Sequence, residues 1–100
     1  MRIVILGSAR RHGITDKEIR GTIEYPMWTA RVVPRILGAA PRLYIGRLVD
    51  AEPPIEVLAD ICGGECVAFH AMLLRQSTLA ELDEQTAVIL SPQLAVRQRK

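Results

Sequence analysis

The segment from residue 55 to residue 70 constrains the fold most, because it predicts two paired strands. Over Ile55–Cys62, the apolar residues at every second position alternate with Glu56 and Asp60. This period of two is typical of a strand with one buried face. Gly63-Gly64 then supplies a tight turn into Glu65–His70, as in a hairpin. The chain is therefore expected to build an antiparallel sheet around this hairpin.

A helix is predicted before the sheet by signals that lie close together. Thr15 is a candidate N-cap, and Glu18 completes the spacing of a capping box. The helix should run over residues 16–24, since Pro26 prevents its continuation. Residues 8–12 are predicted to form a helical turn that precedes it. The N-terminal part thus predicts two successive helices.

Further elements complete the predicted fold. Residues 28–33 and 42–49 are rich in strand formers and lie between turn residues, whereas residues 3–6 predict a strand or the lead into the first helix. Thr78 and Glu81 repeat the capping-box spacing and predict a short C-terminal helix. The expected class is α+β: two N-terminal helices packed on an antiparallel sheet of about four strands, followed by a short C-terminal helix.

Composition limits the partners of the chain. Four aromatic residues in 100 exclude base stacking as the main mode of binding. Residues 1–50 carry nine cationic and four anionic side chains, whereas residues 51–100 carry four and seven. Eleven of the thirteen cations are Arg, the residue that contacts phosphate in a bidentate manner. This asymmetry favours a polyanion-binding half that a partner can mask, although solvated surface cations would give the same pattern.

The chain shows no targeting or membrane signal. The apolar run over residues 3–6 is too short for a signal peptide, and no stretch approaches the length of a membrane span. The expected location is the cytoplasm. Cys62 and Cys66 flank the glycine turn, where either two reduced thiols or a disulfide is possible. Without further ligands they do not predict a metal site.

Two clusters contain the candidate catalytic residues. Arg10, Arg11 and His12 precede the first capped helix, where the cations and the helix dipole would attract phosphate. His70 is followed five residues later by Arg75. A strict two-residue turn would place His70 on the side of Val57, whereas a three-residue turn with a bulge would place it beside Glu56 and Asp60. The alternation favours the bulge.

A third set of residues is spread over the middle strands and their connections. On the sheet face opposite the helices, these residues would form a concave positive surface, or they would serve only to keep strand edges soluble. The set consists of Arg31, Arg35, Arg42 and Arg47, with Tyr44 among them.

Three segments resemble a known family. Residues 11–15 (Arg-His-Gly-Ile-Thr) are similar to the opening motif of BrnT-type toxins, and residues 42–46 to their Arg-x-x-x-Gly strand. Residues 67–72 with Arg75 resemble the last strand and basic turn of small relatives. The resemblance covers about residues 3–76, but the family usually has Ser-Ala-Arg where this chain has His-Ala-Met.

The resemblance implies a RelE/ParE-like fold, a ribonuclease that needs no metal or other cofactor, and neutralisation by a cognate antitoxin. It divides the single domain into a toxin part over residues 1–76 and a C-terminal helical extension with a basic tail over residues 77–100. The partners implied are the antitoxin and mRNA, with a homodimer or a toxin–antitoxin hetero-oligomer as the assembly.

The leading hypothesis is an mRNA interferase in which the 2′-hydroxyl of the substrate attacks the adjacent phosphorus. Such a reaction needs a base, an acid and cations. His70 and His12 are the acid–base candidates and Arg75 the charge stabiliser, while Arg10, Arg11 and Arg42 position the strand. A non-catalytic ParE-like module that inhibits a protein target and an inert interaction domain are the alternatives.

Overall fold

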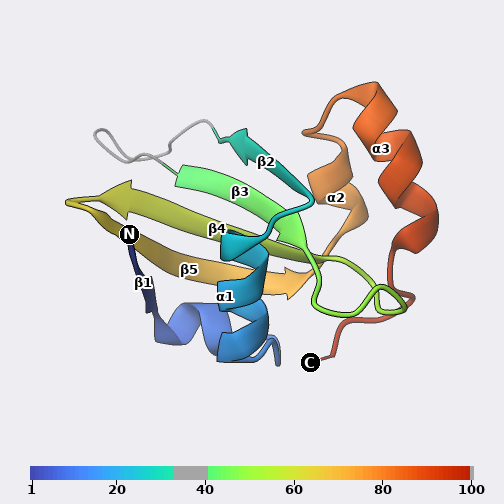
Figure 1. Ribbon diagram of the computed structural model, residues 1–100. Helices are drawn as coiled ribbons and strands as arrows, with labels where there is room; N and C mark the ends of the chain where they lie inside the picture. Colours follow the sequence, from blue (N-terminus) through green and yellow to red (C-terminus); the bar gives the residue numbers. More distant parts are fainter. Residues whose placement is uncertain (33–40, 100) are drawn as a thin grey trace.

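A five-stranded mixed sheet forms the centre of the protein (Figure 1). The computed structural model describes residues 1–32 and 41–99. The strand order is β1-β5-β4-β3-β2, with β1 parallel to β5 and every other pair antiparallel. The strands are β1 (Arg2–Ile5), β2 (Trp28–Arg31), β3 (Pro41–Gly46), β4 (Ile55–Cys62) and β5 (Glu65–Leu73).

Helices cover both faces of this sheet. On one face, Ile19 of α1 and Ala9 of η1 pack with Val57 of β4 in one apolar cluster. On the other face, Leu79 and Leu90 of the C-terminal helices pack with other apolar residues in a second cluster. We call these the α1 face and the C-terminal face. The helices are η1 (Gly7–Arg10), α1 (Asp16–Glu24), α2 (Gln76–Leu79), α3 (Glu84–Leu90) and η2 (Ser91–Gln93).

The helix predicted over residues 16–24 is confirmed, and so is its capping box. The backbone N–H of Glu18 donates to Thr15 Oγ1 (3.2 Å), and the N–H of Thr15 donates to Glu18 Oε1 (3.0 Å). These reciprocal bonds satisfy two helix-end donors. The start of α1 is therefore set by residues three positions apart.

The predicted hairpin is also present, and it contains a bulge. Gly63 and Gly64 have φ values of +57° and +78°, and a tight two-residue turn needs such positive values at both positions. Leu58 pairs with His70, but the next residue, Ala59, pairs with Ala68. Phe69 is thus one extra residue in β5. This bulge lies within the strands and not at the turn.

The predicted arrangement of helices and strands is wrong. The sheet has five strands and is mixed, because the apolar residues of β1 pair with β5 in parallel. Only one α-helix lies near the N-terminus, since residues 7–10 form a single 3₁₀ turn, and α2 and α3 follow the sheet. They cover a face that the sequence already marks as apolar: Leu43, Tyr44 and Ile45 are consecutive and all buried, as in strands covered on both sides.

The C-terminal segment belongs to the same packed unit. Leu94 joins Leu79 and Leu90 on the C-terminal face. The capping box predicted at Thr78 is wrong, because Thr78 is buried inside α2, and α3 is capped by Asp83 instead. Within residues 1–32 and 41–99, no helix combines the length and the apolar character needed to cross a membrane.

The two cysteines are free and lie on opposite faces of the hairpin. Cys66 pairs with Ile61 and is buried, whereas Cys62 pairs with Glu65 and is exposed. Because neighbouring residues on a strand point in opposite directions, this register separates the two thiols.

Candidate functional site

A buried carboxylate, Glu56, organises the C-terminal face. Glu56 lies on β4, the middle strand of the five, and its side chain is only 1 % exposed. Its Oε2 accepts hydrogen bonds from Arg75 Nε (3.1 Å) and Nη2 (2.8 Å), and lies 2.9 Å from His70 Nε2. Its Oε1 accepts from Thr78 Oγ1 (2.6 Å) and from the Arg75 backbone N–H (2.9 Å). One side chain therefore joins β5 to the start of α2.

These contacts keep Glu56 ionised. Burial by itself raises the pKa of Glu56, but the hydrogen bonds from His70, Arg75 and Thr78 offset burial and lower the pKa to about 2. An ionised carboxylate only accepts hydrogen bonds. His70 Nε2 therefore carries the proton of the bond to Glu56.

The bulge decides on which face His70 lies. The turn at Gly63-Gly64 has two residues, which alone would place His70 on the side of Val57. The extra residue Phe69 reverses this, so that His70 lies opposite Leu58 on the face of Glu56.

His12 reaches His70 because the N-terminal segment is attached at the same bulge. β1 ends at Ile5, after which the Leu6 N–H donates to Ala68 O (2.9 Å) and Ser8 Oγ to Phe69 O (2.6 Å). This attachment brings η1 and the following loop against β5. The rings of His12 and His70 meet edge to face, with their centroids 6.1 Å apart.

The site can carry acid–base chemistry on one small anionic group. The two rings are in contact edge to face, so that two groups capable of acid–base chemistry lie side by side. The His70 side chain is 21 % exposed and that of Arg75 42 %, so both can be reached from solvent. The predicted residues His12, His70 and Arg75 are thus brought together.

The arginines of the first cluster differ in availability. Arg10 Nε and Nη2 donate to the two carboxylate oxygens of Asp16 (2.8 Å each), so this guanidinium already has an anionic partner. Arg11 is exposed. Of these two arginines beside His12, Arg11 is therefore better placed for an added anion.

The predicted concave arginine surface opposite the helices is wrong. Arg31 pairs with Arg42, and Arg42 pairs with Ala59 of the α1-face cluster. Cross-strand partners share a face, so these two arginines lie on the α1 face and not beside Glu56. Arg35 lies outside the described residues.

Arg47 and Tyr44 are held in structural contacts. Arg47 Nη1 donates to Gln93 Oε1 (2.6 Å) and to Glu52 O (3.2 Å), and so links the β3–β4 connection to η2. Tyr44 is buried on the α1 face beside Cys66, and burial raises the pKa of its hydroxyl. Neither residue faces the imidazole pair.

Glu56 and Thr78 are the members of the site that sequence reasoning missed. Alternation marked Glu56 as a residue on the polar side of a strand. The available signal was the apolar run over residues 43–45 of the neighbouring strand, which indicates a sheet covered on both sides. A glutamate on a covered face needs partners, and Thr78 is one of them.

Among the described residues, no three His, Cys, Asp or Glu side chains are arranged so that they could hold a metal ion. Comparison of the chain with protein-family models, with curated proteins and with solved structures finds no match.

Proposed function

We propose that the protein is an endoribonuclease that cleaves RNA without a metal ion, through the 2′-hydroxyl of its substrate. The observation that carries the proposal is the pair of imidazoles 6.1 Å apart, one of which is bonded to a buried carboxylate that also holds an arginine. An acid, a base and a cation are the components this reaction requires, and two imidazoles and an arginine can supply them.

In this mechanism, one imidazole removes the proton from the 2′-hydroxyl as its oxygen bonds to the adjacent phosphorus. The bond from phosphorus to the 5′-oxygen breaks, and the second imidazole donates a proton to that oxygen. The products are a 2′,3′-cyclic phosphate and a 5′-hydroxyl end. Arg75, whose Nη1 is not bonded to Glu56, stabilises the negative charge on the pentacovalent phosphorus, and Glu56 orients His70. Either histidine can fill either role.

The resemblance of residues 11–15, 42–46 and 67–72 with Arg75 to BrnT-type toxins supports a biological setting for this activity. We propose that the protein is the toxin of a type II toxin–antitoxin system, that it cleaves mRNA in the cytoplasm and that a cognate antitoxin neutralises it.

The test is cleavage of a short RNA by the purified protein in EDTA. We expect a 2′,3′-cyclic phosphate product and a bell-shaped dependence of kcat/KM on pH, because one imidazole must be protonated and the other unprotonated. His12→Ala and His70→Ala should each lower kcat by roughly 100-fold or more. A substrate with 2′-deoxyribose at the cleaved position should remain intact.

Arg20→Ala, which removes an exposed cation from α1, is the matched control and should cleave at the wild-type rate. Unchanged cleavage by a His12→Ala, His70→Ala double variant would refute the catalytic assignment. Growth arrest by a protein that leaves RNA intact would favour the non-catalytic module.

A further inference from the structure

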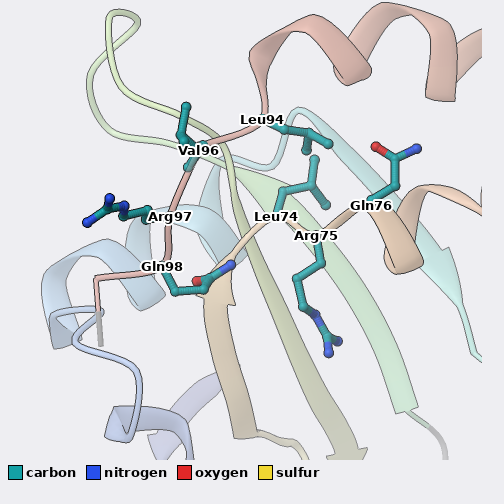
Figure 2. Close-up of a pocket in the computed structure, with 8 residues that line it drawn as sticks. Leu74, Arg75, Gln76, Leu94, Val96, Arg97 and Gln98 are labelled. Carbon is teal, nitrogen blue, oxygen red and sulfur yellow. The ribbon is translucent and has the colours of Figure 1, made fainter.

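A cavity of about 360 Å³ lies between the end of β5 and the C-terminal segment. Its walls are residues 74–76, at the end of β5 and the start of α2, and residues 94–98 of the C-terminal segment. In Figure 2, Leu74 and Leu94 lie side by side at its centre, with Gln76 on one side and Arg97 on the other. Pockets for small ligands begin at about this size.

Arg75 connects the cavity to the imidazole site. It lines the cavity, and its guanidinium donates to the same oxygen of Glu56 that lies 2.9 Å from His70 Nε2. Figure 2 shows the Arg75 side chain leaving the cavity toward the sheet. Arg75 is therefore the residue that the cavity and the imidazole site share.

The lining suits an anion with an apolar body. Leu74, Leu94 and Val96 provide aliphatic surface, Arg97 is cationic, and no lining residue is acidic, whereas the Arg75 guanidinium points out of the cavity to Glu56. The side chains of Gln76 and Arg97 are exposed, and no hydrogen bond joins either to another described residue. An amide can pair with the edge of a base, and a guanidinium with phosphate.

The C-terminal wall is held in place by two residues outside the reactive site. Gln98 Nε2 donates to Leu73 O (2.9 Å), and Gln98 Oε1 accepts from the Leu73 N–H (3.0 Å), as a neighbouring strand would. Arg99 Nη1 and Nη2 then donate to the two oxygens of Glu18 (2.6 and 2.8 Å). The cavity thus exists only while this segment stays bound to β5 and α1.

We propose that this cavity is a nucleotide subsite that holds the residue of single-stranded RNA next to the cleaved phosphate. Gln76 contacts the base, Arg97 contacts the flanking phosphate, and the aliphatic side chains cover the face of the base. The proposal deepens the ribonuclease function and rests on it for the identity of the ligand.

The first experiment measures binding separately from cleavage. The His70→Ala variant is titrated with each of the four nucleoside 5′-monophosphates, and the ¹H–¹⁵N signals of Gln76, Arg97 and residues 94–98 are followed. We expect at least one nucleotide to shift these signals, whereas inorganic phosphate at the same concentration leaves them unmoved. Arg97→Ala and Gln76→Ala in this background should each raise Kd about fivefold or more, whereas Arg20→Ala should leave it unchanged.

The second experiment uses the wild-type background and two RNA lengths. Gln76→Ala should raise KM about fivefold for a tetranucleotide and for a dinucleotide, because both contain the nucleotide next to the cleaved phosphate. Arg97→Ala should raise KM about fivefold for the tetranucleotide only, because the dinucleotide has no flanking phosphate, and kcat should change in neither variant. Gln98→Ala, which loosens the wall without removing a contact to the nucleotide, should raise the KM for the tetranucleotide.

Each outcome has one meaning. If the protein cleaves RNA but no nucleotide shifts the signals of the cavity residues, the subsite is overturned and the ribonuclease function stands. If nucleotides shift these signals but the protein does not cleave RNA, the ribonuclease function is overturned and the cavity remains a nucleotide-binding site. Equal shifts with phosphate alone would reduce the cavity to an anion site and overturn the proposal. Shifts with an uncharged dileucine peptide and not with nucleotides would assign the cavity to a protein partner, which also overturns it.

Discussion

The surroundings of Glu18 and of Glu56 differ, although both glutamates hold an arginine. Glu18 caps its own helix and binds Arg99 at the surface, where the side chains are 12 % and 32 % exposed. Glu56 is 1 % exposed, and its partners come from β5, from α2 and from Arg75 at the N-cap of α2. Glu18 belongs to the capping box of α1, which forms without the ion pair to Arg99, whereas Glu56 has no hydrogen-bond partner close to it in the sequence. The comparison indicates that Glu18 secures a segment and Glu56 assembles a site.

Removal of Glu56 should have the largest effect on stability. Glu56→Ala leaves the Thr78 hydroxyl, the Arg75 N–H and His70 without their acceptor, and should lower the free energy of unfolding by about 3 kcal/mol. Glu18→Ala should lower it by about 1 kcal/mol, since it loses a cap and a partly exposed pair. Urea unfolding measures both.

Glu56→Gln keeps the shape of the side chain and removes only its charge. Its loss in the free energy of unfolding should lie between the losses of Glu18→Ala and Glu56→Ala. Equal losses in the free energy of unfolding for Glu18→Ala and Glu56→Ala would contradict the difference that we infer between the two regions.

Acid should weaken both regions over the same range of pH. Hydrogen bonds from Arg99 and Thr15 lower the pKa of Glu18 to about 2, and the pKa of Glu56 is also about 2, against an ordinary value of 4.5. A lowered pKa contributes stability that is complete above pH 4.5 and is lost as the pH falls toward 2. For Glu56 this corresponds to about 3 kcal/mol.

The measurement is the free energy of unfolding between pH 7 and pH 2 for the wild type and the Glu56→Gln variant. The variant should show the shallower decline below pH 4.5. Parallel curves would mean that Glu56 titrates alike in the folded and unfolded chains.

Loss of Arg99 should have the smallest effect, and a local one. Arg99→Ala should lower global stability by less than about 1 kcal/mol, since its partner is also a helix cap. The Leu73 N–H, which donates to Gln98, should exchange its hydrogen about fivefold faster as the C-terminal segment opens. Arg2→Ala, from a pair with side chains 79 % and 40 % exposed, is the control and should leave this exchange unchanged. Unchanged exchange in Arg99→Ala would show that Gln98 alone holds the segment.

The sequence by itself determined the elements whose signals are local. Thr15 and Glu18 are three residues apart, and the glycine turn joins two strands adjacent in the chain, so α1, β4 and the turn could be predicted to within a residue, whereas β5 continues three residues beyond the predicted His70. Propensity and capping act over one helical turn, and the matching contacts form wherever the rest of the chain lies.

Only the tertiary structure decided which distant groups meet. One extra residue at Phe69 moves His70 to the face of Glu56, and a one-residue change of register reverses every side chain beyond it. His12 reaches His70 only because β1 pairs in parallel with β5 and ends at this bulge. Thr78 meets Glu56 because α2 covers the second apolar face. These contacts join residues far apart in the chain, and packing of the whole sheet selects among them, whereas no short stretch of sequence encodes them.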